Sequence, residues 1–198
     1  MAAGDGRNFS ENNADRGKLM PVNMKDIIEE TFKKMAQKKS LDKITVKDLV
    51  EECQISRQTF YYHFCDIMEV IEWSLQKGVE KMMEESRRAK DPEDALKIFI
   101  TSAVENGKSI DRLLDSQKRE EIEKMIVRAI RSYIEKMVKE YKREVSLSYD
   151  DLQVTLDFYS YGIVGLLLEN CRKPGVDPER LAHQMALLLT GNMVKEKE

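Results

Sequence analysis

Cysteines and long hydrophobic runs are scarce in this chain of 198 residues. The three cysteines, Cys53, Cys65 and Cys171, are an odd number without a paired spacing. This pattern argues against a disulfide framework and for reduced thiols in a cytoplasm. No apolar run approaches the ~18 residues that a membrane span needs, and the N-terminus lacks the apolar segment of a secretion signal. We therefore expect a cytoplasmic protein with no membrane partner.

A catalytic constellation is also lacking. The two histidines, His63 and His183, are far apart in the sequence and pair with no nucleophile, and there is no glycine-rich phosphate loop. His63 and Cys65 are two residues apart, so in a helix their side chains do not face each other. A metal or redox site at these residues is the less favoured reading. We expect a protein that is not an enzyme, without a cofactor or a metal.

The charge is balanced and not strongly of one sign. The net charge is −3, with 41% hydrophobic and 35% charged residues, which indicates a real core under a charged surface. Residues 20–65 contain eight basic and seven acidic side chains, so this segment is near +1 and the remainder is acidic. The chain is therefore not a general polyanion binder. Residues 20–65 can present a positive face only if their acidic side chains lie on the opposite side from their basic ones.

Hydrophobic and polar residues do not alternate with the two-residue period of a β-strand over any useful length. We therefore predict an all-α fold of about nine helices. Residues 1–20 have almost no apolar periodicity and are expected to form a disordered tail. A first helix follows from about Met24, and Asp66 caps a fourth helix that runs to about Lys90. Later boundaries are predicted at Asp91–Pro92 (start), Asn106–Gly107 (end), Ile110–Leu114 (short helix), Gln117 to about Arg143 (long helix), Ser148 (start) and Asp177–Pro178 (start).

The segment from Thr45 to Phe64 carries the strongest pattern. It holds two short helical patterns, each opened by a capping hydroxyl, Thr45 or Ser56, with a turn of only about four residues between them. Two helices joined in this way form a helix-turn-helix, whose second helix can enter a DNA major groove. Phe60 and Phe64 are four apart and share one face. Together with Leu49, Val50 and Ile55, they are predicted to form the core of the unit.

The opposite face of the second helix is polar and aromatic, which suits phosphates and base edges. Arg57 can read guanine bidentately, and Gln58 can read adenine. At the start of the first helix, Thr45 and Lys47 bring a hydroxyl, free backbone N–H groups and a cation toward phosphate. The residues predicted to contact DNA are Thr45, Lys47, Ser56, Arg57, Gln58, Thr59, Tyr61, Tyr62 and His63.

The run SRQTFYYHF, followed by Asp66 and a long helix, resembles the TetR/AcrR family of transcriptional regulators. The run RQTFYYHF, followed by Asp66-Ile67 and by EVIEW at residues 69–73, is also similar to a subgroup that includes activators of dihydroxyacetone-kinase operons. The resemblance implies a base or phosphate contact for Tyr61 and phosphate contacts for Tyr62 and His63. Two departures stand out: Gln54 occupies a turn position that usually holds glycine, at a cost of about 1 kcal/mol, and Cys65 replaces a basic or polar residue.

The helix predicted after Ser148 becomes apolar nearly all round from Gly162 onward. A helix that is apolar on every side must be covered on every side, and a partner subunit is the economical cover, although completion of a monomer core is the alternative. The residues predicted at the dimer interface are Leu156, Tyr159, Gly162, Ile163, Leu166, Leu181, Met185 and Leu188. Two helices from each subunit would form a four-helix bundle with two-fold symmetry, as the resemblance also implies.

The resemblance further implies an effector site in the C-terminal helices. Five large apolar residues could line it: Phe99, Tyr133, Met137, Phe158 and Tyr161. A filled core is the alternative reading of the same residues. The effector could be a small molecule or a co-regulator protein, and the sequence does not identify it.

We therefore divide the chain into a tail (1–20), a helix-turn-helix DNA-binding domain (21–65) and a ligand-binding and dimerisation domain (66–198). The first hypothesis is a homodimeric transcriptional regulator that binds double-stranded DNA at a palindromic operator. The second is a helical protein-interaction module that retains the fold with weak DNA binding. Gln54, Cys65 and the near-neutral charge of residues 20–65 motivate this second hypothesis.

Overall fold

The computed structural model describes residues 23–140, 147–170, 173 and 175–189. Within these ranges the chain forms eight α-helices, one short 3-10 helix and no strand, which confirms the all-α prediction. The elements are α1 (Met24–Ala36), η1 (Leu41–Lys43), α2 (Val46–Glu52), α3 (Arg57–His63), α4 (Ile67–Ser86), α5 (Pro92–Leu114), α6 (Arg119–Glu140), α7 (Tyr149–Asn170) and α8 (Pro178–Leu189). The predicted tail and Cys171 lie outside the described residues.

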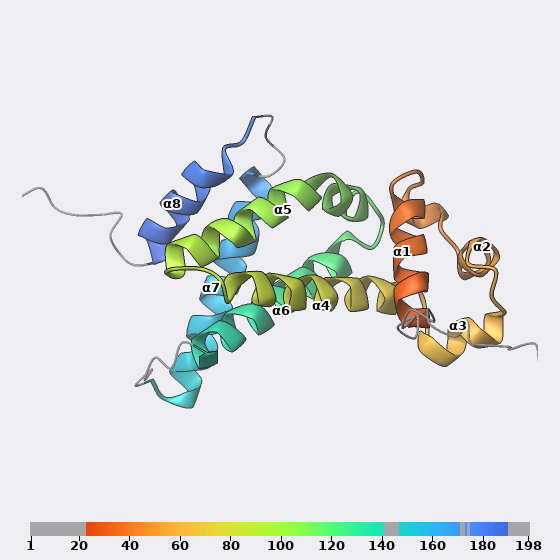
Figure 1. Cartoon of the computed structure of the whole chain (residues 1–198), viewed down its shortest axis with the longest axis horizontal. Helices are drawn as coiled ribbons and strands as arrows, with labels where there is room; N and C mark the ends of the chain where they lie inside the picture. Colours follow the sequence, from red (N-terminus) through yellow and green to blue (C-terminus); the bar gives the residue numbers. More distant parts are fainter. Residues whose placement is uncertain (1–22, 141–146, 171–172, 174, 190–198) are drawn as a thin grey trace, which may run out of the picture.

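Helices α1 to α3 form a head at one end of the molecule, and α4 leads from the head into a body built by α5 to α8 (Figure 1). The head has a small apolar core in which Leu49 and Phe60 are 0% exposed and Phe64 is 2% exposed. The rings of Phe60 and Phe64 lie 6.1 Å apart, and Phe64 meets Trp73 of α4 edge to face. The core of the head is therefore continuous with the first turns of α4.

Caps set the beginnings of the short helices. The Thr45 hydroxyl accepts a hydrogen bond from the Asp48 N–H, and the Asp48 carboxylate accepts one from the Thr45 N–H, which makes a complete capping box. The Ser56 hydroxyl accepts from the Thr59 N–H at 3.0 Å. Such caps stabilise a helix by about 1 kcal/mol each. Since α2 and α3 have only seven residues each, the caps are a large part of what makes them start where they do.

The turn of the helix-turn-helix is a Schellman motif. The N–H of Ile55 donates to the carbonyl of Val50, and the N–H of Gln54 donates to the carbonyl of Glu51. The residue after the C-cap of such a motif adopts a left-handed conformation and is usually glycine. Here it is Gln54, with φ of 55°. The backbone strain expected from the sequence is therefore present.

We expect Gln54→Gly to stabilise the protein by about 0.5–1 kcal/mol, because glycine removes the left-handed strain at some cost in unfolded-chain entropy. Chemical denaturation of the two proteins measures the difference. Gln37→Gly is the matched control, because Gln37 has φ of −71° in the ordinary helical region and glycine there should destabilise by about 0.5–1 kcal/mol. Equal stability changes of one sign at both positions would contradict the explanation.

A buried carboxylate joins the head to α4. Glu29 of α1 is 1% exposed, and its carboxylate accepts a hydrogen bond from the Ser74 hydroxyl at 3.0 Å. Lys33 of α1 pairs with it, as does Lys77 of α4 at 3.6 Å. Lys77 also contacts Asp26 at 2.8 Å, and these two carboxylates raise the pKa of Lys77. A buried charge persists when it is paired and hydrogen-bonded, so this cluster holds α1 in one position on α4.

The head is held at a second point by the turn between α5 and α6. The Asp42 carboxylate of η1 accepts a hydrogen bond from the Gln117 N–H at 3.1 Å. Arg112 of α5 donates to the backbone carbonyl of Gln37, just after α1. The orientation of the head therefore depends on both α4 and the α5–α6 corner.

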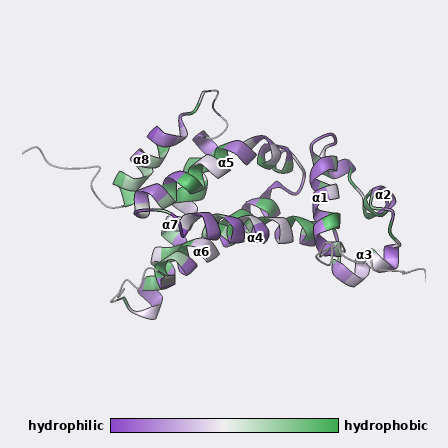
Figure 2. Cartoon of the chain, in the orientation of Figure 1, coloured by the Kyte–Doolittle hydropathy of each residue, from purple (hydrophilic) through white to green (hydrophobic). Residues whose placement is uncertain are grey.

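The body packs α5 against α8, and α6 against both α4 and α7. Figure 2 shows hydrophobic residues along both α5 and α8. Asp91 caps α5 with Pro92 in its first turn, as predicted. Ser148 and Asp177 likewise accept hydrogen bonds from the first turns of α7 and α8.

Two predicted helix boundaries are wrong. Asn106–Gly107 does not end a helix, because α5 continues to Leu114 and replaces two predicted helices. The Asn106 side chain donates back to the Ser102 carbonyl at 2.7 Å, and Gly107 lies on the buried side of the helix. Burial of that side stabilises the continuous helix by more than the roughly 1 kcal/mol that glycine costs. Helix α4 ends at Ser86, four residues before the predicted end.

No helix in the described ranges is both long enough and apolar enough to cross a lipid bilayer.

Candidate nucleic-acid interface

The two faces of α3 differ sharply in exposure. Phe60 is 0% exposed, whereas the neighbouring Tyr61 and Tyr62 are 56% and 85% exposed. The ring of Tyr61 meets the ring of Phe60 edge to face at 5.4 Å, and Tyr62 meets His63 in the same way at 5.0 Å. Each tyrosine is therefore in contact with a neighbouring ring while more than half of its surface remains exposed. Large exposed aromatic side chains on a rigid base are typical of a binding surface.

Three further residues predicted to contact DNA are exposed near the starts of α2 and α3. Arg57 and Gln58 are exposed in the first turn of α3, and Lys47 is exposed at the start of α2. The Ser56 and Thr59 hydroxyls bond to each other at 2.8 Å in the cap of α3. Both are therefore engaged in starting the helix, and their predicted DNA contacts stay untested.

Thr45 lies in a different environment from the one expected for a phosphate contact. Its hydroxyl and its N–H both donate to the Asp48 carboxylate, each at 3.0 Å. These hydrogen bonds lower the pKa of Asp48, so a negative charge occupies the start of α2. A phosphate at this point would have to displace or approach that carboxylate. Lys47, paired with Glu51 at 3.9 Å on the surface, is the cation left for such a contact.

The cysteines of the head have the properties of ordinary thiols. Cys65 is exposed next to Glu69, whose side-chain hydrogen bond and negative charge raise the pKa of this thiol. Burial raises the pKa of Cys53. A raised pKa leaves less of the reactive thiolate at neutral pH. The described residues also contain no cluster of three or more side chains that could hold a metal ion.

A stripe of apolar and small residues is exposed along α7. Val154, Phe158 and Tyr161 are 69%, 73% and 64% exposed, and Gly162 and Gly165 are exposed beside them. Their spacing of four, three, one and three residues places them on one side of the helix. A Cβ atom at either glycine would meet no atom within 4 Å, so the fold of the single chain does not require glycine there. We call these five residues the α7 stripe.

The structure places the predicted dimer residues in two groups. Four are buried inside the chain and are core residues: Leu156, Ile163, Leu181 and Met185. Gly162 and Leu188 are exposed, while Tyr159 and Leu166 are partly exposed. Helix α7 is apolar nearly all round, so periodicity alone could not tell its covered side from its open side. The α7 stripe is the side that remains open.

The predicted effector residues are not brought together. Phe99 and Tyr133 stack at 5.4 Å in the core, where the Tyr133 hydroxyl bonds to the buried Ser86 hydroxyl at 2.7 Å. Met137 is partly buried nearby on α6. Phe158 and Tyr161 point outward on the α7 stripe instead. Phe99 and Tyr133 are therefore part of a filled core, whereas Phe158 and Tyr161 belong to the exposed surface of α7.

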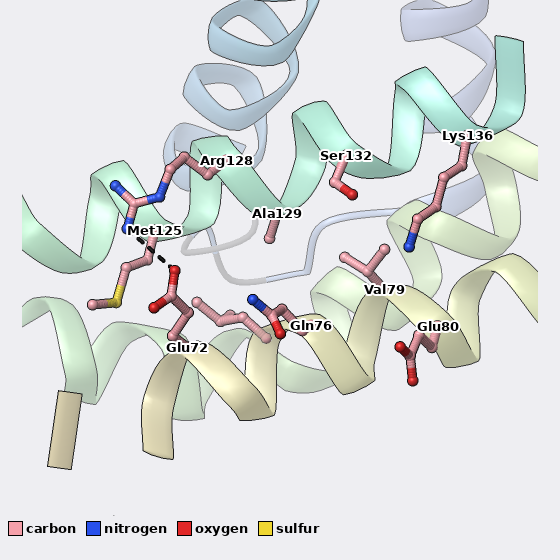
Figure 3. Close-up of a pocket in the computed structure, with 10 residues that line it drawn as sticks. Glu72, Gln76, Val79, Glu80, Met125, Arg128, Ala129, Ser132 and Lys136 are labelled. Atoms are coloured by element: carbon pink, nitrogen blue, oxygen red, sulfur yellow. Dashed lines mark hydrogen bonds and ion pairs between the residues drawn. The ribbon is translucent and has the colours of Figure 1, made fainter. Parts of the chain in front are cut away.

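A cavity of about 290 Å³ opens instead between α4 and α6 (Figure 3). We call it the α4–α6 groove. It is lined by Glu72, Leu75, Gln76, Val79, Glu80, Met125, Arg128, Ala129, Ser132 and Lys136. None of the five predicted effector residues lines it. The signal that could have revealed it is a four-residue spacing of polar residues on each of the two helices, at 72, 76 and 80 and at 128, 132 and 136.

Comparisons with known proteins address the fold and the family. Residues 90–191 match a TetR family model described as a transcriptional regulator C-terminal region. No curated protein sequence matches the chain. The dihydroxyacetone kinase operon activator DhaS is similar in structure, with a TM-score of 0.62 and 19% identity over 87% of this chain and 97% of that chain.

Two further solved structures have the same arrangement. A TetR transcriptional regulator from Streptococcus agalactiae 2603V has a TM-score of 0.57 and 21% identity over 85% of this chain and 92% of its own. The TetR family repressor AlkX from Dietzia sp. strain DQ12-45-1b has a TM-score of 0.53 and 14% identity over 86% of this chain and 95% of its own. One relative is named an activator and another a repressor, so the shared fold does not decide the direction of regulation. The match over residues 90–191, which is more than half of the chain, shows that this protein belongs to the TetR family of transcriptional regulators.

Proposed function

We propose that the protein acts in the cytoplasm as a homodimer that binds a palindromic operator on double-stranded DNA. Binding of an effector changes the affinity of the homodimer for this operator. Residues 21–65 are the DNA-binding domain in this proposal, and residues 66–198 are the dimerisation and effector domain. The observation that carries it is the exposed face of α3, where Tyr61 and Tyr62 stand out above a buried Phe60.

Each residue of this face has a chemical role in the proposal. Arg57 and Gln58, exposed at the start of α3, read base edges, because their side chains can make bidentate contacts to guanine and adenine. Tyr61, Tyr62 and His63 donate hydrogen bonds to phosphates and fix the register of the helix on the duplex. The net charge of the head contributes little to DNA affinity in this proposal, because basic and acidic residues nearly balance in residues 20–65. Affinity therefore has to come from specific contacts and from two copies of the head.

The second copy is supplied through the α7 stripe. Two-fold pairing of α7 across its exposed glycines, with Leu188 of α8 also exposed, would cover apolar surface that the single chain leaves in water. A two-fold dimer presents two recognition helices to half-sites about 34–36 Å apart. This geometry is the reason to expect a palindromic operator.

Regulation would act through the joint between the head and α4. The paired and buried Glu29 fixes α1 to Ser74 and Lys77 of α4, so a shift of α4 would move the head. An effector that prefers one position of α4 changes the spacing of the two heads and hence the affinity for DNA. The effector is a small molecule or a co-regulator protein in this proposal.

We expect Tyr61→Ala to weaken operator binding about ten- to a hundredfold, since it removes an aromatic contact and a hydroxyl donor. The operator is first obtained by binding-site selection with the purified dimer, and affinity is then measured by fluorescence anisotropy at several salt concentrations. The affinity of the unmodified protein should fall steeply as salt rises, because bound phosphates release counterions.

Tyr149→Ala is the control for the loss of an exposed tyrosine. Tyr149 is 75% exposed at the start of α7, away from the head (Figure 1), and its removal should leave the affinity unchanged. The DNA-binding proposal fails if selection yields no preferred sequence and binding shows no salt dependence. It also fails if Tyr61→Ala binds DNA as the unmodified protein does.

A further inference from the structure

The α4–α6 groove has one acidic wall and one basic wall. Glu72, Gln76 and Glu80 follow one another at four-residue intervals along α4, so they share one side of that helix. Arg128, Ser132 and Lys136 do the same on α6. Figure 3 shows the two series on neighbouring helices, with Glu72 and Glu80 on α4 and with Arg128 and Lys136 on α6.

The two ends of the groove differ. At one end, Glu72 and Arg128 form an ion pair across it at 3.5 Å. At the other end lie Glu80 and Lys136, both exposed, and neither takes part in an ion pair among residues that the structure describes. Val79 and Ala129 lie between the walls and provide an apolar floor. The groove is thus closed by its own charges at one end and open at the other.

This arrangement restricts the chemistry of a ligand. A molecule seated at the open end meets a carboxylate from α4 and an ammonium from α6, and it gains charge-assisted hydrogen bonds from both only if it carries both signs of charge. A singly charged ligand would leave one wall unsatisfied or repelled. No aromatic side chain lines the groove, so a flat ring finds no stacking partner. The volume of about 290 Å³ lies at the lower edge of the range for small-molecule sites.

We propose that the α4–α6 groove binds a small zwitterion of the amino-acid class. The carboxylate of the ligand contacts Lys136, its ammonium contacts Glu80, and its side chain rests on Val79 and Ala129. The inference builds on the proposed function, because it identifies the class of effector for the regulator. Helix α4 carries the acidic wall and also Ser74 and Lys77, which hold Glu29 of the head, so occupation of the groove acts on the helix that positions the head.

The test measures binding of free L-amino acids, added one at a time, by isothermal titration calorimetry with the full-length protein. We expect at least one amino acid to bind at a single site per chain. Its N-acetyl derivative lacks the ammonium and its methyl ester lacks the carboxylate. Both derivatives should bind at least about tenfold more weakly, because each loses a charge-assisted hydrogen bond.

Two variants locate the site. Glu80→Gln and Lys136→Met each remove one exposed charge, and each should weaken the binding amino acid about tenfold or more. Glu85→Gln on α4 and Lys124→Gln on α6 are the matched controls, because these charges lie outside the groove and pair with Lys81 and Glu120. The controls should bind the amino acid as the unmodified protein does.

Failure of all free amino acids to bind would overturn the proposal, and so would equal binding of the acetylated or esterified forms. Binding that survives both Glu80→Gln and Lys136→Met would overturn the assigned site. DNA binding of the ligand-free protein is measured separately. A protein that binds DNA but no amino acid refutes this inference alone, whereas a protein that binds no DNA refutes the proposed function.

Discussion

Phe158→Asp should convert the proposed homodimer to a monomer and lower operator affinity by at least about a hundredfold. Phe158 is 73% exposed at the centre of the α7 stripe, where a second α7 would cover it. An aspartate there would be buried without a partner in a dimer, at a cost of several kcal/mol for each copy, whereas in a monomer it is simply solvated. Because the proposed operator needs two heads, the loss of the dimer also removes the avidity of binding.

The measurement is molar mass by light scattering during size-exclusion chromatography, together with DNA binding at the same protein concentration. Tyr149→Asp is the matched control, because Tyr149 is also exposed but lies nine residues away, about half a helical turn around α7 from Phe158. We expect this control to stay dimeric. A dimeric Phe158→Asp protein with unchanged mass would show that the interface lies elsewhere.

Phe60→Ala should destabilise the head by about 3–5 kcal/mol, which is the usual cost of emptying a buried aromatic site. Phe60 is 0% exposed and contacts Phe64, which in turn contacts Trp73. The rest of the head core is small, so no other side chain can refill the space. DNA binding should be lost together with the fold of the head, while the helices of the body remain.

Chemical denaturation followed by tryptophan fluorescence checks this expectation, because Trp73 is the only tryptophan of the chain and lies where the head meets α4. Tyr62→Ala is the control on the same helix: Tyr62 is 85% exposed, and stability should change by less than about 0.5 kcal/mol. A Phe60→Ala protein within about 1 kcal/mol of the unmodified stability would contradict the assignment of Phe60 to the core.

The helix-turn-helix could be predicted from the sequence because its determinants are local. The caps Thr45 and Ser56 act within three residues, and Phe60 and Phe64 lie one turn apart. The left-handed conformation of Gln54 is what the family resemblance implies, because this turn position usually holds glycine, and it is present with φ of 55°. Only the detail of the cap at Thr45, where Asp48 takes both of its donors, was not apparent from the sequence.

The α5 boundary and the α7 interface show where prediction from the sequence failed. The pair Asn106–Gly107 is a good stop signal in isolation, but the packing of α5 against α8 and α4 carries the helix through it. On α7, apolar residues occur on nearly every side, so Leu156 and Phe158 look alike in the sequence. Leu156 is 2% exposed and Phe158 is 73% exposed. Only the packing of the neighbouring helices decides which of the two is buried.

The sequence by itself determined the helical class, the start of the capped helices and the division of α3 into a buried and an exposed face. These features depend on hydrogen bonds and side-chain contacts within about one helical turn. The tertiary structure decided which side of α7 stays open, where the head is anchored on α4, and that Glu72 faces Arg128 across a groove. Those pairs are separated by dozens of residues in the chain, and their alignment depends on how whole helices pack against one another.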